Sequence, residues 1–183
     1  MCGFILVFIE FGQKRKESCV GVTEKEHVVE HFDEVLREFL RDVDEIWHAG
    51  DFGNIETADA IAAFKPLRGV YGNCDDHTVR LAHPYVQFFE LEGKRILMMH
   101  IGGYPGRYDF KAFQLINAHL PDIFICGHSH ILKVINDTKY NVLTINPGAA
   151  GIQGFHNVRT ALRFRIENGT IKDMEVGEWE KKL

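Results

Sequence analysis

The chain has 183 residues, of which 45% are hydrophobic and 26% are charged, and its formal net charge at pH 7 is −5. This is the composition of an ordinary globular protein, and the length favours a single domain, residues 1–183, over a disordered chain. The acidic balance argues against a broad nucleic-acid-binding surface, because such a surface needs a basic face to displace counterions from phosphates.

The four cysteines and the first apolar run indicate the compartment. The cysteines form no Cys-x-x-Cys pair, and Cys74 and Cys126 lie beside the candidate site described below. A reduced cytoplasmic protein is therefore expected rather than a disulfide framework. The apolar run at residues 4–9 is too short to span a bilayer and lacks a preceding basic segment and a cleavage site. We expect it to form a buried strand, and we expect no membrane contact.

A loop and a long helix are predicted after this strand. The charged segment at residues 13–17 is most simply a solvated loop. Apolar residues then recur at helical spacing, which predicts a helix over 23–40. Thr23 and Glu26, three residues apart, are a candidate capping box for its first turn.

Strands and helices alternate in the next segment. Residues 45–51 predict a strand that ends in Gly-Asp. Asn54 is placed to cap a helix over 55–64, and Pro66 stops that helix. Residues 67–71 predict another strand, so the alternation favours parallel pairing and a layered α/β core.

The second half is richer in strands. A hairpin turn is expected at Glu92-Gly93, and residues 109–119 predict a helix. Turn signals at Asn136-Asp137 and Asn168-Gly169 separate later strands. The expected strands are 86–90, 95–99, 122–125, 131–135, 142–145, 161–166 and 171–176. Two packed sheets with flanking helices accommodate these strands better than a single parallel sheet does.

A pair of histidines marks the first candidate site. Cys126-Gly127-His128-Ser129-His130 follows the apolar run at residues 122–125. Two histidines one residue apart can point their imidazoles at one small volume, and neutral imidazole is the commonest protein ligand for catalytic metals. The alternative is a pair of turn histidines bonded to backbone groups.

Polar residues also follow four other predicted strands. Alone, each of these motifs is more often a turn or a packed histidine, but open α/β folds assemble their sites from strand ends. The four motifs are Gly50-Asp51, Gly72-Asn73-Cys74-Asp75, His100 and Asn146-Pro147-Gly148. In this order, each after a strand, they are far more specific together than separately.

With these motifs, residues 44 to 178 resemble the calcineurin-like metallophosphoesterases, specifically the small single-domain bacterial and archaeal phosphodiesterases. The resemblance implies an α/β fold, a four-layer αββα sandwich in which two packed mixed β-sheets are flanked by helices. It also implies a hydrolase of small phosphodiesters that uses two divalent transition-metal ions, Mn, Ni, Fe or Zn, and a hydroxide held between them.

The resemblance also implies roles for the motif residues. Asp51 would bridge both ions, because a carboxylate has two oxygens and can span ions about 3.5–4 Å apart. Asn73, His100 and His128 would complete one metal's ligand set, and His130 would bind the other ion. Asp51, Asn73 and His100 are the expected catalytic residues.

Cys74 and Asp75 are expected beside the metals or the substrate. Larger relatives place a histidine that protonates the leaving oxygen where this chain has Cys74, a poor general acid, so diesters with good leaving groups are favoured. Asp75 would either orient a ligand imidazole or stabilise the turn. Gly148 and Gly151 would let backbone approach the substrate or simply make a tight turn. Packing or a solvated loop is the expected role of four other polar residues: His48, His77, Arg107 and His156.

The family's first motif, Asp-x-His after the first strand, is absent. Glu10 falls at the aspartate position and is a candidate ligand, whereas Gly12 falls at the histidine position and offers no donor. We therefore expect the second metal position, beside His130, to be weak or empty. Three explanations stay open: an active hydrolase, a metal-impaired binding scaffold like the retromer subunit of this superfamily, or a frameshift affecting residues 10–22. The sequence leaves the natural substrate and a homo-oligomeric state open.

Overall fold

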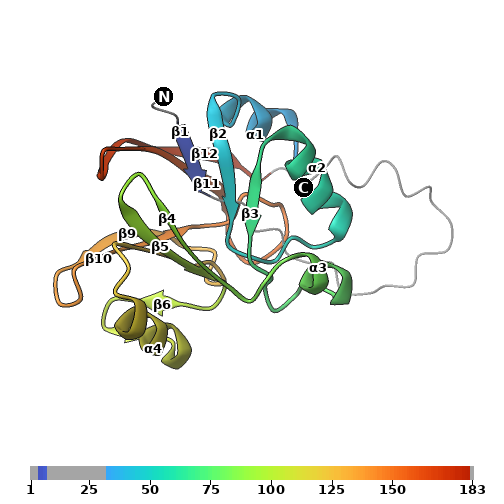
Figure 1. The fold of residues 1–183 in the computed structure, drawn as a ribbon. Coiled ribbons are helices and arrows are strands. Elements are labelled where there is room, and N and C mark those ends of the chain that lie inside the picture. The colour runs from blue at the N-terminus through green and yellow to red at the C-terminus, as the bar shows by residue number, and fades with distance from the viewer. Residues whose placement is uncertain (1–3, 8–31, 182–183) are drawn as a thin grey trace, which may run out of the picture.

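The computed structural model describes residues 4–7 and 32–181 (Figure 1). One five-stranded sheet has the order β12-β11-β1-β2-β3, in which β1, β2 and β3 are parallel and β11 and β12 are antiparallel additions. Its strands are β1 (Phe4–Val7), β2 (Val43–His48), β3 (Leu67–Gly69), β11 (Val158–Glu167) and β12 (Thr170–Glu180).

The second five-stranded sheet has the order β4-β5-β8-β10-β9, with a parallel centre of β5, β8 and β10 and antiparallel strands at both edges. Its strands are β4 (Val86–Leu91), β5 (Lys94–Met99), β8 (Ile123–Ile125), β9 (Leu132–Asp137) and β10 (Val142–Pro147). A small hairpin of β6 (Gly103–Tyr104) and β7 (Arg107–Tyr108) lies beyond β5.

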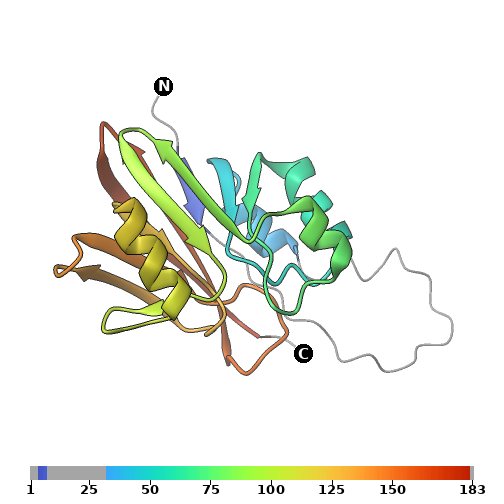
Figure 2. The same ribbon diagram turned by 60° about the horizontal axis from the view of Figure 1, so that its bottom comes forward.

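The four helices of the described residues cover the outer faces of the two sheets (Figure 2). They are α1 (Glu34–Phe39), α2 (Ile55–Phe64), α3 (His77–Ala82) and α4 (Phe110–His119). In Figure 2, α4 lies against the second sheet and the other three helices lie on the far side of the first sheet. No helix in the described part of the chain is long and apolar enough to cross a membrane.

Alternating side chains on the strands produce these layers. On β5, Ile96 and Met98 are in the core between the two sheets, and the neighbouring Leu97 and Met99 are in the core beneath α4. On β2, Trp47 is in the core between the sheets and the preceding Ile46 packs with the helices of the first sheet. Because successive strand residues point to opposite faces, each sheet is buried on both sides. The predicted four-layer sandwich is confirmed.

Several element bounds differ from the predictions. The helix expected over 23–40 is wrong in its bounds, since α1 begins after Asp33, whose side chain accepts from the Leu36 amide at 3.1 Å. Strand β9 runs through Asp137, so the turn comes after the expected Asn136-Asp137. The strand expected over 67–71 ends at Gly69. Helix α3 and the β6–β7 hairpin were not expected at all, and residues 13–17, Thr23 and Glu26 lie outside the described residues.

Candidate metal centre

The motif residues follow parallel strands whose carboxyl ends meet at one edge of the sandwich. Asp51 and Asn73 follow β2 and β3 of the first sheet. His100 and His128 follow β5 and β8 of the second sheet. A site at this edge therefore receives side chains from both sheets, as the carboxyl ends of parallel strands in α/β folds commonly provide.

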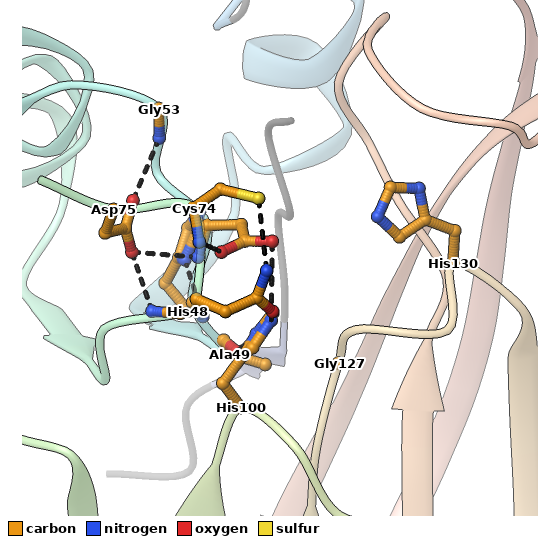
Figure 3. Close-up of polar contacts among 12 residues, drawn as sticks. His48, Ala49, Gly53, Cys74, Asp75, His100, Gly127 and His130 are labelled. Atoms are coloured by element: carbon orange, nitrogen blue, oxygen red, sulfur yellow. Dashed lines mark hydrogen bonds and ion pairs between the residues drawn. The ribbon is translucent and has the colours of Figure 1, made fainter. Parts of the chain in front are cut away.

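His100 connects the two sheets in this group and lies beside Ala49 in Figure 3. Its Nε2 atom is 3.0 Å from Oδ1 of Asn73 and 3.3 Å from Oδ2 of Asp51. Its Nδ1 atom is 2.7 Å from the Ala49 carbonyl oxygen, and because a carbonyl only accepts, Nδ1 carries a proton. In a neutral ring, Nε2 then presents a lone pair to two further acceptors.

Three acceptor atoms that face one another without a hydrogen need a cation or an extra proton between them. A nitrogen, a carboxylate oxygen and an amide oxygen are together a donor set that suits divalent transition metals. The hydrogen bond from Nδ1 to a carbonyl is also the arrangement that usually orients a metal-binding imidazole. Asp51, Asn73 and His100 could thus hold such an ion.

Asp51 is buried, and its backbone lies in the left-handed region at φ 58°. Burial alone raises the pKa of its carboxyl, but the hydrogen bond and charge of His100 and the Cys74 amide lower it, so the net pKa is below its usual value. The Cys74 amide donates to Oδ1 of Asp51 at 2.8 Å. The carboxylate form is therefore the one held at the edge of the sheets.

Asp75 joins the two strand-end loops of the first sheet. Its carboxylate accepts from the amides of Gly72 at 2.7 Å, Asp51 at 2.9 Å and Gly53 at 3.1 Å. Burial raises its pKa, and the nearby Asp51 charge acts in the same direction, although the three amides oppose them. Of the two roles considered for Asp75, these contacts match turn stabilisation. Gly72 is needed here, because a Cβ atom would collide with Oδ1 of Asp51.

Asn146 holds the loop that carries the two motif histidines. Its side-chain amide donates to the Gly127 carbonyl at 2.7 Å and to the Ser129 hydroxyl at 3.1 Å. His128 and His130 both have left-handed backbone angles, φ 68° and 56°. The His128 ring packs edge-on against the His100 ring with centroids 5.2 Å apart, which brings a fourth motif residue beside the cluster.

His130 stands apart from that cluster in Figure 3. Its Nδ1 atom is instead 3.1 Å from Nδ1 of His156. From the sequence, we expected His156 to lie in a solvated loop, without a role in the site. The Nε2 atom of His156 is 2.9 Å from the Gly151 carbonyl oxygen. Burial lowers the pKa of His156, and the charges of Lys181, His130 and Arg159 act in the same direction. The hydrogen bond to Gly151 raises the pKa, but the net pKa is below its usual value.

The remaining candidates lie elsewhere. His48 is buried, accepts from the Gly50 amide at 3.2 Å and stacks on Phe52, as expected for a packed residue. His77 is the exposed first residue of α3. Glu10 and Gly12 lie outside the described residues. Within residues 4–7 and 32–181, no three His, Cys, Asp or Glu side chains form a group able to hold a metal, and the cluster around His100 includes the amide of Asn73.

A cavity of about 270 Å³ borders the His128 loop. It is lined in part by Arg107 and Lys133, and the Lys133 ammonium lies 4.0 Å from the centroid of the Tyr104 ring. Sequence reasoning missed Lys133 and Tyr104, because nothing in their local pattern separates them from ordinary strand and loop residues. The pairing of β6 with β7 sets Tyr104 opposite Arg107, and both line the cavity together with His128.

Comparison with known proteins places the fold and the motifs in a family. The family model of the calcineurin-like phosphoesterase superfamily domain matches residues 25–169. A probable metallophosphoesterase of Mycoplasma pneumoniae is 30% identical over 142 residues, which cover 74% of this chain and 82% of that protein.

Two solved structures show the same fold. A Thermotoga maritima protein has a TM-score of 0.65 and 22% identity, covering 96% of this chain and 98% of its own. Vps29 of Entamoeba histolytica, solved with Zn²⁺, has a TM-score of 0.59 and 18% identity, covering 96% and 98%. Since the family model spans most of the sequence, this chain belongs to the calcineurin-like phosphoesterase superfamily.

Proposed function

We propose that this protein is a metal-dependent phosphodiesterase whose reaction centre is the strand-end cluster around His100. Calcineurin-like metallophosphoesterases generally use divalent metals. The observation that carries the proposal is that Oδ2 of Asp51 and Oδ1 of Asn73 both lie within 3.3 Å of Nε2 of His100. A neutral structural histidine would need a donor opposite that lone pair and a protonated one would donate to Asp51, whereas a ligand histidine shares a cation with the two oxygens.

Each residue of the site has its own role in the proposed function. Asp51, Asn73 and His100 would hold one ion, and His128 would complete its ligand set from the neighbouring loop. His130, on the same loop, serves a second and weaker position. Bound divalent ions neutralise phosphoryl charge and lower the pKa of water, which is the chemistry the reaction needs. Asp75 and Asn146 bind backbone groups of the two loops and so support the positions from which the ligand side chains extend.

The cavity beside His128 supports a diester as the substrate. A diester carries a second organic group, and a space of about 270 Å³ lined by His128 can receive one. Arg107 and Lys133 on its wall favour an anionic substrate. Cys74 supports the same choice, because a poor general acid suits diesters with good leaving groups.

A binding scaffold is the second candidate. The fold shared with Vps29 supports it, because that protein is named for vacuolar protein sorting and not for hydrolysis. A scaffold that binds metal would keep its metal content and show no turnover. Metal content and turnover therefore have to be measured on the same samples.

The test compares Asp51→Asn and His128→Ala with His119→Ala, an exposed histidine in the last turn of α4. Each protein is dialysed against Mn²⁺, analysed for bound metal and assayed with a chromogenic phosphodiester. Both site variants should lose the tightly bound ion and at least about 100-fold in turnover, and the control should lose neither. Full metal content and turnover in the site variants would overturn the assignment, and metal binding without turnover in the unaltered protein would favour the scaffold.

A further inference from the structure

We propose that His156 is a metal ligand that, with His130, forms the second metal position of this chain. The two imidazoles come from different segments, the His128 loop and the loop before β11. The family motif would supply a histidine at position 12, where this chain has glycine. His156 would take over that missing imidazole. The proposal rests on the proposed function, because it adds a ligand to the second metal position that the proposed function assigns to His130.

The hydrogen bonds of His156 fit a ligand. Its Nε2 atom is 2.9 Å from the Gly151 carbonyl oxygen, which can only accept, so the ring proton lies on Nε2. In a neutral ring, Nδ1 then carries the lone pair that faces His130. His100 shows the same pattern, with one nitrogen on the Ala49 carbonyl and the other facing the cluster. A backbone carbonyl on the outer nitrogen is the usual support of a metal-binding imidazole.

The distance between the two Nδ1 atoms, 3.1 Å, also fits. Two nitrogens that are each about 2.0–2.1 Å from one ion lie about 2.9 Å apart at a right angle and about 3.3 Å apart at the tetrahedral angle. A direct hydrogen bond from His130 to His156 has a similar length. In that case His156 would only position His130, so the experiment must separate a ligand from a positioning residue.

The loop that carries His156 is held in place from both sides. The Lys181 ammonium donates to the carbonyl oxygens of Gly154 at 2.7 Å and His156 at 3.3 Å. The Arg159 guanidinium donates to the Ala150 carbonyl at 2.5 Å. The His156 ring therefore has a defined place, and it is half-buried and open to ions in solution. The positive charge of Lys181 opposes a nearby cation, which makes this position weaker than the one at His100.

Cobalt substitution tests the proposal on the unaltered protein. Co²⁺ is paramagnetic, and each imidazole bound to it shows its remaining ring N–H as a strongly shifted exchangeable proton signal. Loading beyond one equivalent should add such signals for His130 and His156. The signal of the His156 Nε2 proton should disappear in His156→Asn, because that proton exists only in the imidazole. A positioning residue that is not bonded to Co²⁺ would give no contact-shifted signal of its own.

Titration calorimetry with Co²⁺ supplies the second measurement. The unaltered protein should show a tight and a weak class of site, and His156→Asn should weaken only the weak class by at least about tenfold. His119→Asn, on α4, is the matched control and should change neither class. An unchanged weak class and an unchanged spectrum in His156→Asn would overturn the proposal and leave the tight site intact. No Co²⁺ binding by the unaltered protein would overturn the proposed function as well.

Discussion

Three of the proposed ligands have a backbone conformation that non-glycine residues rarely adopt. Asp51, His128 and His130 have φ angles of 58°, 68° and 56°. Each left-handed residue costs on the order of 1 kcal/mol, and such residues persist only where their surroundings hold them. Asp75 supports the first through its bond to the Asp51 amide, and Asn146 supports the loop of the other two. The cost is consistent with a site kept for its chemistry.

Cys74 leads to a prediction about leaving groups. Its backbone amide binds Asp51, and its thiol lies 3.2 Å from the Asn73 side-chain nitrogen, beside the cluster. Without a general acid there, the rate of diester hydrolysis should fall steeply as the leaving-group pKa rises. Cys74→His should flatten this dependence and speed poor leaving groups by about 10²–10⁴-fold, the usual contribution of general acid catalysis. Rates measured over a series of aryl and alkyl diesters check this.

Cys74→Ser is the matched control, because a serine hydroxyl is no acid near neutral pH, and its slope should equal that of the unaltered protein. A flat dependence in the unaltered protein, with chemistry shown to limit the rate, would contradict this interpretation of Cys74.

At the scale of elements, helix α1 is attached to the first sheet through its cap. Asp33 accepts from the Leu36 amide at 3.1 Å with one oxygen and pairs with the Arg159 guanidinium at 2.5 Å with the other. Arg159 is buried on β11 and also binds the Ala150 carbonyl. One carboxylate thus links the start of a helix, a strand and the loop that leads to His156.

Two variants of Asp33 should separate these contributions to stability. Asp33→Asn keeps an oxygen for the Leu36 amide but loses the charge facing Arg159, and should cost about 1 kcal/mol of unfolding free energy. Asp33→Ala also loses the cap, which should cost about 1 kcal/mol more. Urea unfolding of the three proteins measures both steps. Equal stabilities for the two variants would show that the cap contributes nothing.

The pH dependence of the same comparison is a control. Burial raises the pKa of Asp33, but the Arg159 hydrogen bond and charge and the Leu36 amide outweigh it, so the net pKa lies below 3.8. The unfolded chain therefore takes up this proton first, and the stabilisation is present above pH 3.8 and lost as the pH falls through the lower folded-state pKa. The unfolding free energy by which the unaltered protein exceeds Asp33→Asn should shrink in that acid range and stay constant near neutral pH.

The sequence predicted the elements that carry strong local signals. The helix over 55–64 was predicted with its observed bounds, because Asn54 caps it and Pro66 stops it. The helix expected over 23–40 has the wrong bounds, because Phe32 and Asp33 are not helical and Asp33 caps a helix that begins at Glu34. The earlier part of the expected helix lies outside the described residues. Helix α3 has only six residues and one buried side chain, too little for a periodic pattern.

Most of the candidate site was also predicted, from the expectation that polar residues at the ends of parallel strands lie close together. Asp51, Asn73 and His100 are in contact as expected, because each follows a parallel strand at the same edge. The partnership of His130 with His156 could not be predicted, since 26 residues and two strands separate them and His156 lies in a loop without a motif. For Asp75 the sequence left two roles open, turn stabilisation and orientation of a ligand imidazole. Its bonds to backbone amides match the first role, and they depend on how the two loops pack together.

At the scale of the whole molecule, the site lies across the join between the two sheets. Asp51 and Asn73 belong to the first sheet and His100 and His128 to the second. The direct contacts of His100 with Asp51 and Asn73 already cross that join. An ion bound by side chains from both sheets would therefore connect the two halves of the sandwich, and its binding free energy would add to the stability of the fold.

This arrangement predicts that divalent metal raises the melting temperature. At a free Mn²⁺ concentration 100 times the dissociation constant, binding to the folded state adds about 2.7 kcal/mol. For a chain of 183 residues this corresponds to a rise of roughly 5–11 °C. Differential scanning calorimetry with Mn²⁺, and again after a chelator is added, measures the rise and its reversal. Asp51→Asn should lose nearly all of the rise, because its amide cannot supply the anionic ligand, and His119→Ala should keep it. An equal rise in Asp51→Asn would place the stabilising ion elsewhere and separate metal binding from the edge where the two sheets meet.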